Sequence, residues 1–351
     1  MKNKSLLKRI AAMAIVVVAV WLFWPSMPEQ VIMVNKSTIS TAKEKPTRLA
    51  QKALGGETTE LAVIPEKITS NDSATLVAQA YAAELNFPTY SQPLSSNDFD
   101  RLQPNFFNPQ SIPVDDTGTT ISAELSKYRY TYPEPVFATL SGENIAFAEL
   151  VLVDLDSGKS LLTRKFEQDE NSWTVQFDGE RNFPTQLQAT VKAQVNGKNI
   201  SIALALKYVD SVATLEGFDP AFNQDADMVL KANLTTRDKG LYRVRANLFD
   251  ANQQPIAHLV SKEKLSQGSS SIELKAHQSV LQGRQGPFYL STFSIELMSP
   301  APGTPKRYGD SAINQFEIKN FALSSLSDVP YKPSKQEQQR LQLLQNMAQG
   351  R

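Results

Sequence analysis

The sequence contains no cysteine and only two histidines among its 351 residues. The absence of cysteine excludes disulfides, thiolate nucleophiles and cysteine-based metal sites together. Net charge is also missing, because 36 basic residues balance 36 acidic ones. Nucleic-acid binding usually requires a basic surface, so nucleic acid is not an expected partner. The sequence also lacks a G-x-S-x-G elbow, a Walker loop, a dinucleotide fingerprint and an H-E-x-x-H motif.

Long hydrophobic runs are confined to residues 10–24, which read IAAMAIVVVAVWLFW and follow four cations within residues 1–9. Fifteen residues rise about 22 Å as a helix, somewhat less than the ~30 Å hydrocarbon core of a bilayer. The pattern predicts a cytoplasmic stub at 1–9 and a transmembrane signal anchor at 10–24, single-pass in the inner membrane, with the bulk of the chain periplasmic. The alternative is a cleaved secretory signal and a secreted or periplasmic product, although small residues of a cleavage site do not follow the run.

The next two segments differ in composition. Residues 25–74 have no sustained periodicity and are predicted to be a flexible linker. Residues 75–118 are expected to hold a short helix, 75–86, followed by an extended strap. The strap, Phe87–Asp116, has five prolines and five aromatic residues. It is expected either to wrap on the first β domain or to be a recognition segment that a partner protein orders. The candidate protein-binding residues are Tyr90, Phe99, Phe106 and Phe107.

From Thr119 onward apolar and polar residues alternate with a period of two for about two hundred residues. The dipeptide Asn196-Gly197 between two alternating runs predicts a β-hairpin. The fold class is therefore mainly β, with a first antiparallel sandwich at 119–210 and a second at 211–323. Expected inward rows of the second sandwich are Tyr242/Val244/Ala246/Leu248 and Tyr289/Phe293/Ile295/Leu297.

The two sandwiches are interpreted as a repeat. Residues 146–161 align with residues 242–257, which places Leu152 on Leu248 and Asp154 on Asp250. A repeat of this size predicts tandem domains rather than one large sheet. In the second copy the stretch LQGRQGPFYL, residues 281–290, resembles a glycine-rich turn and Gly-Pro-aromatic sequence of bacterial extracytoplasmic immunoglobulin-like domains. The resemblance covers residues 240–298 and implies a sandwich that serves as a spacer or a binding module. It assigns no catalytic residue, and the cysteine pair of antibody-type domains is absent.

Residues 324–351 form a predicted tail with a short C-terminal helix. Ser334 and Glu337 have the spacing of a capping box, and apolar residues follow on one face. A helix of this length is marginal alone in water, so it is expected to dock on the second domain or to pair with another chain.

Few residues have the chemistry of a catalytic or metal site. His258 and His277 lie on strands that are expected to pair in the second domain, without a spacing typical of metal ligands. Residues 154–159 begin like a calcium loop but lack its glycine and final glutamate, so a β-turn is the better explanation. Three aspartates between residues 219 and 227 could contact Ca²⁺ but are interpreted as part of a solvated loop: Asp219, Asp225 and Asp227. No catalytic, cofactor-binding or metal-binding residue is therefore expected, and no cofactor.

These observations favour a membrane-anchored, periplasm-facing, non-enzymatic protein-binding or adaptor module. Without its four N-terminal cations the exported part has 32 basic residues against 36 acidic ones, so it is mildly acidic. The expected partner is another envelope protein, and no small-molecule substrate is evident. The alternatives are a passive spacer or scaffold subunit of an envelope complex and, more distantly, a hydrolase such as a carbohydrate-active enzyme.

Overall fold

The computed structural model describes residues 70–349 except 117 and 170–171. The expected cytoplasmic stub, the transmembrane anchor and nearly all of the linker lie outside these residues. Within the described part of the chain, no helix combines the length and the apolar composition needed to cross a bilayer. The helix α2 (Ser70–Glu84) begins inside the segment expected to be linker and ends two residues before the expected end at 86.

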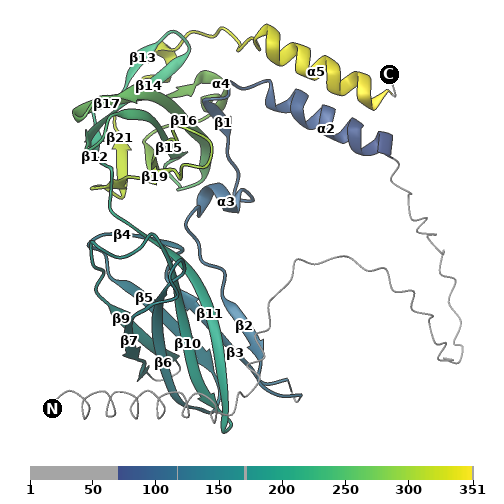
Figure 1. Ribbon diagram of the computed structural model, residues 1–351. Helices are drawn as coiled ribbons and strands as arrows, with labels where there is room; N and C mark the ends of the chain where they lie inside the picture. The colour runs from purple at the N-terminus through teal and green to yellow at the C-terminus, as the bar shows by residue number, and fades with distance from the viewer. Residues whose placement is uncertain (1–69, 117, 170–171, 350–351) are drawn as a thin grey trace, which may run out of the picture. The chain divides into compact units, whose positions relative to one another are not determined.

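The described residues fold mainly as antiparallel β-sheet, with two short parallel pairings. Two sheets enclose a first apolar core and are here called the first sandwich (Figure 1). Their strand orders are β2-β3-β5-β9-β8 and β4-β11-β10-β6-β7. The strands are β2 (Gln110–Pro113), β3 (Thr120–Leu125), β4 (Arg129–Thr131), β5 (Val136–Gly142), β6 (Ile145–Asp154), β7 (Ser160–Lys165), β8 (Glu167–Asp169), β9 (Ser172–Phe177), β10 (Gln186–Val195) and β11 (Lys198–Val209).

Two further sheets enclose a second core and form the second sandwich. One has the order β1-β16-β15-β18-β19, and β21 also pairs with β18. The other has the order β13-β14-β12-β20, and β17 also pairs with β14. The strands are β1 (Ser91–Pro93), β12 (Ala213–Phe218), β13 (Phe222–Gln224), β14 (Asp227–Thr236), β15 (Gly240–Phe249), β16 (Pro255–Leu265), β17 (Gly268–His277), β18 (Phe288–Leu297), β19 (Arg307–Tyr308), β20 (Asp310–Ser311) and β21 (Gln315–Ile318).

Alternation along the strands explains both cores. Successive side chains of a strand point to opposite faces, so every second residue is buried between the two sheets. On β10 the buried row is Leu187, Ala189, Val191, Ala193 and Val195, and on β15 it is Tyr242, Val244, Ala246 and Leu248. The hairpin between β10 and β11 is confirmed, because Asn196 and Gly197 have φ angles of 50° and 75°. Positive φ at both central residues is the conformation of a type I′ turn.

One expected row is wrong at its first residue, Tyr289, whereas Phe293, Ile295 and Leu297 do belong to the second core. At the start of β18 the buried residues are Phe288 and Leu290, whereas Tyr289 between them is only half-buried. Thr292 has a φ of 57°, and the pairing of β18 with β15 shifts beside it. This bulge moves the inward face by one residue, so that Ile295 is buried after it.

The two sandwiches repeat one strand plan. In the first, β3, β5 and β9 are neighbours in one sheet while β7, β6, β10 and β11 are neighbours in the other. In the second, β12, β14 and β17 correspond to the first group, and β16, β15, β18 and β21 to the second. The aligned aspartates have the same local role: Asp154 Oδ1 accepts the Asp156 N–H at 3.0 Å, and Asp250 Oδ1 accepts the Asn252 N–H at 2.8 Å.

The proline-aromatic segment is divided between the two sandwiches instead of wrapping on the first. Its β1 pairs with β16 of the second sandwich, and its β2 pairs with β3 of the first. The chain therefore contributes a strand to the second sandwich before it builds the first.

The C-terminal helix α5 (Lys335–Ala348) begins with the expected capping box of Ser334 and Glu337, which is confirmed. However, α5 packs along α2 rather than on the second sandwich, and Figure 1 shows the two helices side by side.

Candidate functional site

A short stretch between β1 and β2, residues 94–109, crosses from one sandwich to the other and is here called the connector. It contains the single-turn helix α3 (Phe99–Leu102). Both of its ends are anchored by buried apolar side chains. Leu94 is buried and its N–H donates to the Ile256 carbonyl at 3.0 Å. Phe107 is buried within the first core.

Two asparagines fix the backbone between these anchors. Asn105 Nδ2 donates to the Arg129 carbonyl, and the Arg129 N–H donates to Asn105 Oδ1, both at 2.7 Å. On the other sandwich, the buried Asn247 donates from Nδ2 to the Arg101 carbonyl at 2.7 Å. The connector is therefore held on both sides, which gives it a defined position.

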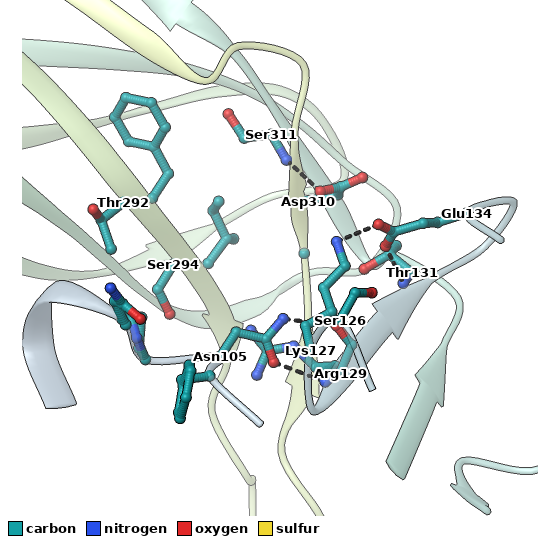
Figure 2. Close-up of a pocket in the computed structure, with 16 residues that line it drawn as sticks. Asn105, Ser126, Lys127, Arg129, Thr131, Glu134, Thr292, Ser294, Asp310 and Ser311 are labelled. Carbon is teal, nitrogen blue, oxygen red and sulfur yellow. Dashed lines mark hydrogen bonds and ion pairs between the residues drawn. The ribbon is translucent and has the colours of Figure 1, made fainter. Parts of the chain in front are cut away.

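A first cavity, of about 390 Å³, lies on one side of the connector (Figure 2). It is lined by residues of the connector and of both sandwiches, and its charged groups are mostly paired. Lys127 forms an ion pair with Glu134. The Arg129 guanidinium lies over the Tyr308 ring, 4.1 Å from its centroid. These contacts leave few charged groups of this cavity available to a ligand.

A second cavity, of about 340 Å³, adjoins the first and shares Pro104, Thr292 and Ser294 with it. It covers the outward side chains of β15, those that alternate with the buried row. Cross-strand pairing places Lys262 of β16 and Glu296 of β18 on either side of Arg243. The cations that line the cavity are Arg101, Arg243, Arg245 and Lys262, and the one lining carboxylate is Asp100.

Glu296 lies beneath this cavity with 3 % of its surface exposed. Its carboxylate accepts from Arg243 Nε at 2.8 Å and from Arg245 Nη2 at 2.6 Å. Burial alone would raise the pKa of Glu296, but the hydrogen bonds and charges of the two arginines outweigh burial and hold the pKa below its usual value. Glu296 is therefore ionised, and it organises two guanidinium groups at the floor of the cavity.

His258 lies at the edge of the same cavity. Asn247 uses its amide N–H on the Arg101 carbonyl, so its Oδ1 is the acceptor of the 2.7 Å bond to His258 Nδ1. The ring therefore carries its proton on Nδ1. Burial, followed by the nearby charges of Arg101 and Arg245, lowers the pKa of His258 to about 4. The ring is neutral at pH 7.

The four expected protein-binding residues do not gather at one place. Tyr90 donates its hydroxyl to the Asp227 carboxylate at 2.9 Å within the second sandwich. Phe107 belongs to the first core. Only Phe99 and Phe106 come together, as an edge-to-face pair with ring centroids 5.1 Å apart. Both stay exposed, at 47 % and 44 %, and Phe106 lines the first cavity.

The other candidates have local structural roles. His277 caps the helix α4 (Gln278–Leu281), since its Nδ1 accepts the Ser279 N–H. The expectation that the strands of the two histidines pair is wrong, because β16 and β17 lie in different sheets. Asp219 bonds Asn233 and Lys231. Within the described ranges, no group of three or more potential ligand side chains is arranged to hold a metal ion.

Arg243, Arg245 and Glu296 escape prediction from the sequence. Charged residues at alternate strand positions ordinarily indicate a solvated face. Here the connector, which is distant in sequence, packs over that face. One signal is present in the repeat: the alignment places Phe147, Glu149 and Val151 at the positions of Arg243, Arg245 and Asn247. The outward row of the second copy thus gains two cations and an amide.

No protein-family model and no curated protein sequence matches this chain. Among solved structures, similarity extends to a DUF4785 family protein from Legionella pneumophila, with 14% identity over 50% of this chain and a TM-score of 0.38. An engineered protein has 10% identity over 29% of this chain and a TM-score of 0.22. The α-2-macroglobulin of Escherichia coli activated by porcine elastase has 12% identity over 53% and a TM-score of 0.22. The chain spans 52% of the Legionella protein's length and 20% and 19% of the other two.

Proposed function

We propose that this chain is a membrane-anchored, periplasm-facing, non-enzymatic protein-binding module of the cell envelope, built on tandem immunoglobulin-like domains. The strand plan supports the domain type. In each sandwich the first, second and fifth principal strands share one sheet and the remaining four share the other, which is the plan of immunoglobulin domains with a C′ strand. The LQGRQGPFYL stretch at 281–290 supports the same family.

The membrane part of the proposal rests on the sequence of residues 1–24. A cationic start followed by fifteen uncharged residues is typical of an uncleaved anchor with a cytoplasmic N-terminus. The linker that follows separates the binding module from the bilayer.

The observation that carries the binding role is the exposed pair Phe99 and Phe106 on the connector. Large aromatic side chains are costly to leave in water, and fixed aromatic groups are typical anchors of protein interfaces. The connector is pinned to both sandwiches by Asn105 and Asn247, so the pair is presented on a rigid support. A preorganised surface loses little conformational freedom on binding, which favours affinity.

Site-specific photo-cross-linking in intact cells tests this role. A photoreactive phenylalanine analogue replaces Phe106 in one strain and Phe147 in another. Phe147 is the matched control, because it is a similarly exposed aromatic at 41 % on the outer face of the first sandwich. We expect a reproducible adduct with one protein at position 106 and none at 147. Equal adducts at both positions, or none at 106, would overturn the binding role and favour a passive spacer.

A further inference from the structure

We propose that the second cavity binds the carboxylates of an acidic peptide segment of the partner protein, with Arg101, Arg243, Arg245 and Lys262 as the recognising groups. This inference rests on the proposed function and names the chemistry of the partner. It follows from the excess of positive charge around the cavity, from the hydrogen-bond donors that its cations leave unused, and from the connector that it shares with the exposed aromatic pair.

The cavity has more positive charge than the protein itself neutralises. Four cations line it, and Lys306 also pairs with Glu296 at 3.7 Å. The carboxylates around these five cations are Asp100 at the wall, the buried Glu296 beneath it and Asp98, whose pKa is lowered by hydrogen bonds and further by the charge of Arg101. Arg101 and Lys262 have no ion pair within the described residues, in contrast to Arg243 and Arg245. Because the exported chain as a whole has an acidic excess, this local positive charge is not a consequence of overall composition.

The donors of the cavity are also incompletely satisfied. Arg245 uses Nη2 on Ser294 and Glu296, and its Nε is buried out of reach of a ligand, which leaves Nη1 as its available donor group. Arg243 uses Nε and Nη2 on Glu296, and no described group accepts from its Nη1. A planar guanidinium binds carboxylate groups with two parallel hydrogen bonds, which an ammonium group cannot reproduce. Two guanidinium groups fixed by one buried carboxylate are therefore oriented in advance for oxyanions.

Size and surroundings favour a peptide over a larger ligand. A volume of about 340 Å³ is near the lower end of ligand pockets, which suits one or two acidic side chains. Phe99 precedes the wall residues Asp100 and Arg101 in the sequence, and its ring packs against Phe106, which lines the first cavity. The two cavities share Pro104, Thr292 and Ser294, so one bound segment could cross from one to the other. A segment with apolar residues next to glutamate or aspartate would cover the aromatic pair and place its carboxylates in the cavity.

The test is fluorescence anisotropy with the full-length protein in detergent and a labelled peptide, Gly-Glu-Glu-Leu-Glu-Glu-Leu-Gly. The control peptide has glutamine at each glutamate. Arg101→Gln with Lys262→Gln removes the two unpaired cations and leaves the Glu296 network intact. The matched variant, Lys165→Gln with Lys192→Gln, removes two exposed cations from the corresponding sheet of the first sandwich.

We expect the cavity variant to weaken peptide binding at least about tenfold, since two charge-assisted hydrogen bonds are lost, and the matched variant to bind as the native protein does. Equal weakening in both variants, or equal binding of the glutamine peptide, would overturn the proposal. Displacement of the peptide by a similar concentration of inorganic phosphate, at constant ionic strength, would overturn it in favour of a small anion. An adduct at Phe106 without acidic-peptide binding would leave the proposed function standing and remove only this inference.

Discussion

The two sandwiches share a strand plan and differ on the outer face of one sheet. In the first, the outward row of β6 consists of Phe147, Glu149 and Val151, and it remains wholly or partly exposed. In the second, the corresponding row of β15 contains Arg243, Arg245 and Asn247, which contact Glu296 or the connector. Every buried polar residue identified in the described ranges lies in the second sandwich or at its edge: Ser91, Ser211, Thr236, Asn247, His277, Ser294 and Glu296.

This difference shows which part of a repeat is free to change. The inward rows must fill the space between two sheets, so both copies keep alternating apolar residues there. The outward rows meet solvent unless another segment covers them, and their residues can vary without loss of the fold. Only the second copy is covered by the connector, and only there has the outward row become a polar network.

The largest effect is expected where the connector enters the first core. Phe107→Ala removes a buried aromatic side chain and should destabilise the first sandwich by about 3–4 kcal/mol. Phe106→Ala, one residue earlier and exposed, should cost less than about 1 kcal/mol. Denaturant titration followed by the fluorescence of Trp173, in the first sandwich, measures both. Similar costs for the two variants would contradict the apolar anchoring of this end.

The next largest loss of stability is expected from Glu296→Ala and should be confined to the second sandwich. Glu296→Ala leaves Arg243 and Arg245 facing each other without a counter-charge, and should destabilise by about 3 kcal/mol. This lies at the lower end for buried pairs, because both arginines remain partly exposed. Gln194→Ala is the matched change. The exposed Gln194 pairs across the strands with Phe147 as Glu296 does with Arg243, and the repeat alignment places Phe147 at the position of Arg243. Hydrogen exchange of β15 and β18 should increase only in the first variant.

Removal of the Asn247 amide, which fixes the connector, should destabilise the protein somewhat less than the two changes above. Asn247→Ala leaves the Arg101 carbonyl and the His258 Nδ1–H without partners, at a cost of about 2 kcal/mol. Val151→Ala at the aligned position should cost less than about 1 kcal/mol, because that side chain is only half-buried. Faster amide exchange at residues 99–106 in the Asn247 variant alone would sharpen the comparison. Unchanged exchange there would show that Leu94 and Phe107 hold the connector without it.

Much of this fold is predictable from the sequence, since alternation reports directly on which face of a strand is buried. The Asn196-Gly197 hairpin and the buried row of β15 from Tyr242 to Leu248 follow from local pattern alone. The bulge at Thr292 does not, because it depends on how β18 pairs with β15 rather than on its own residues.

The candidate site was only partly predictable for a related reason. The exposed Phe99–Phe106 pair lies in the segment that its prolines and aromatics had marked. The sequence does not predict which sandwich the start of this segment packs on, because β1 is three residues long and pairs with a strand more than 160 residues away in sequence. A strand so short has no periodicity, and the cavity over Arg243 and Arg245 exists only once it has paired.

The smallest expected effect is a loss of stability at acid pH that His258 causes in the second sandwich alone, since both histidines lie there. The pKa of His258 in the folded protein is about 4, below the usual 6.5. Above pH 6.5 the ring is neutral in both states and its contribution to stability is fully present. As the pH falls from 6.5 to 4, the unfolded state binds a proton that the folded state does not, so stability is progressively lost.

Because the ring is only partly buried, solvent screening should keep this loss modest. His258→Gln should reduce the fall in melting temperature of the second sandwich between pH 7 and pH 4.5, while the first sandwich is unaffected. Hydrogen exchange measured at both pH values, with rates corrected for the intrinsic pH dependence of exchange, separates the two sandwiches. An identical acid response of native protein and variant would mean that His258 becomes protonated as readily in the folded state as in the unfolded chain. The burial of the ring beside Arg101 and Arg245 would then not be part of the structure in solution.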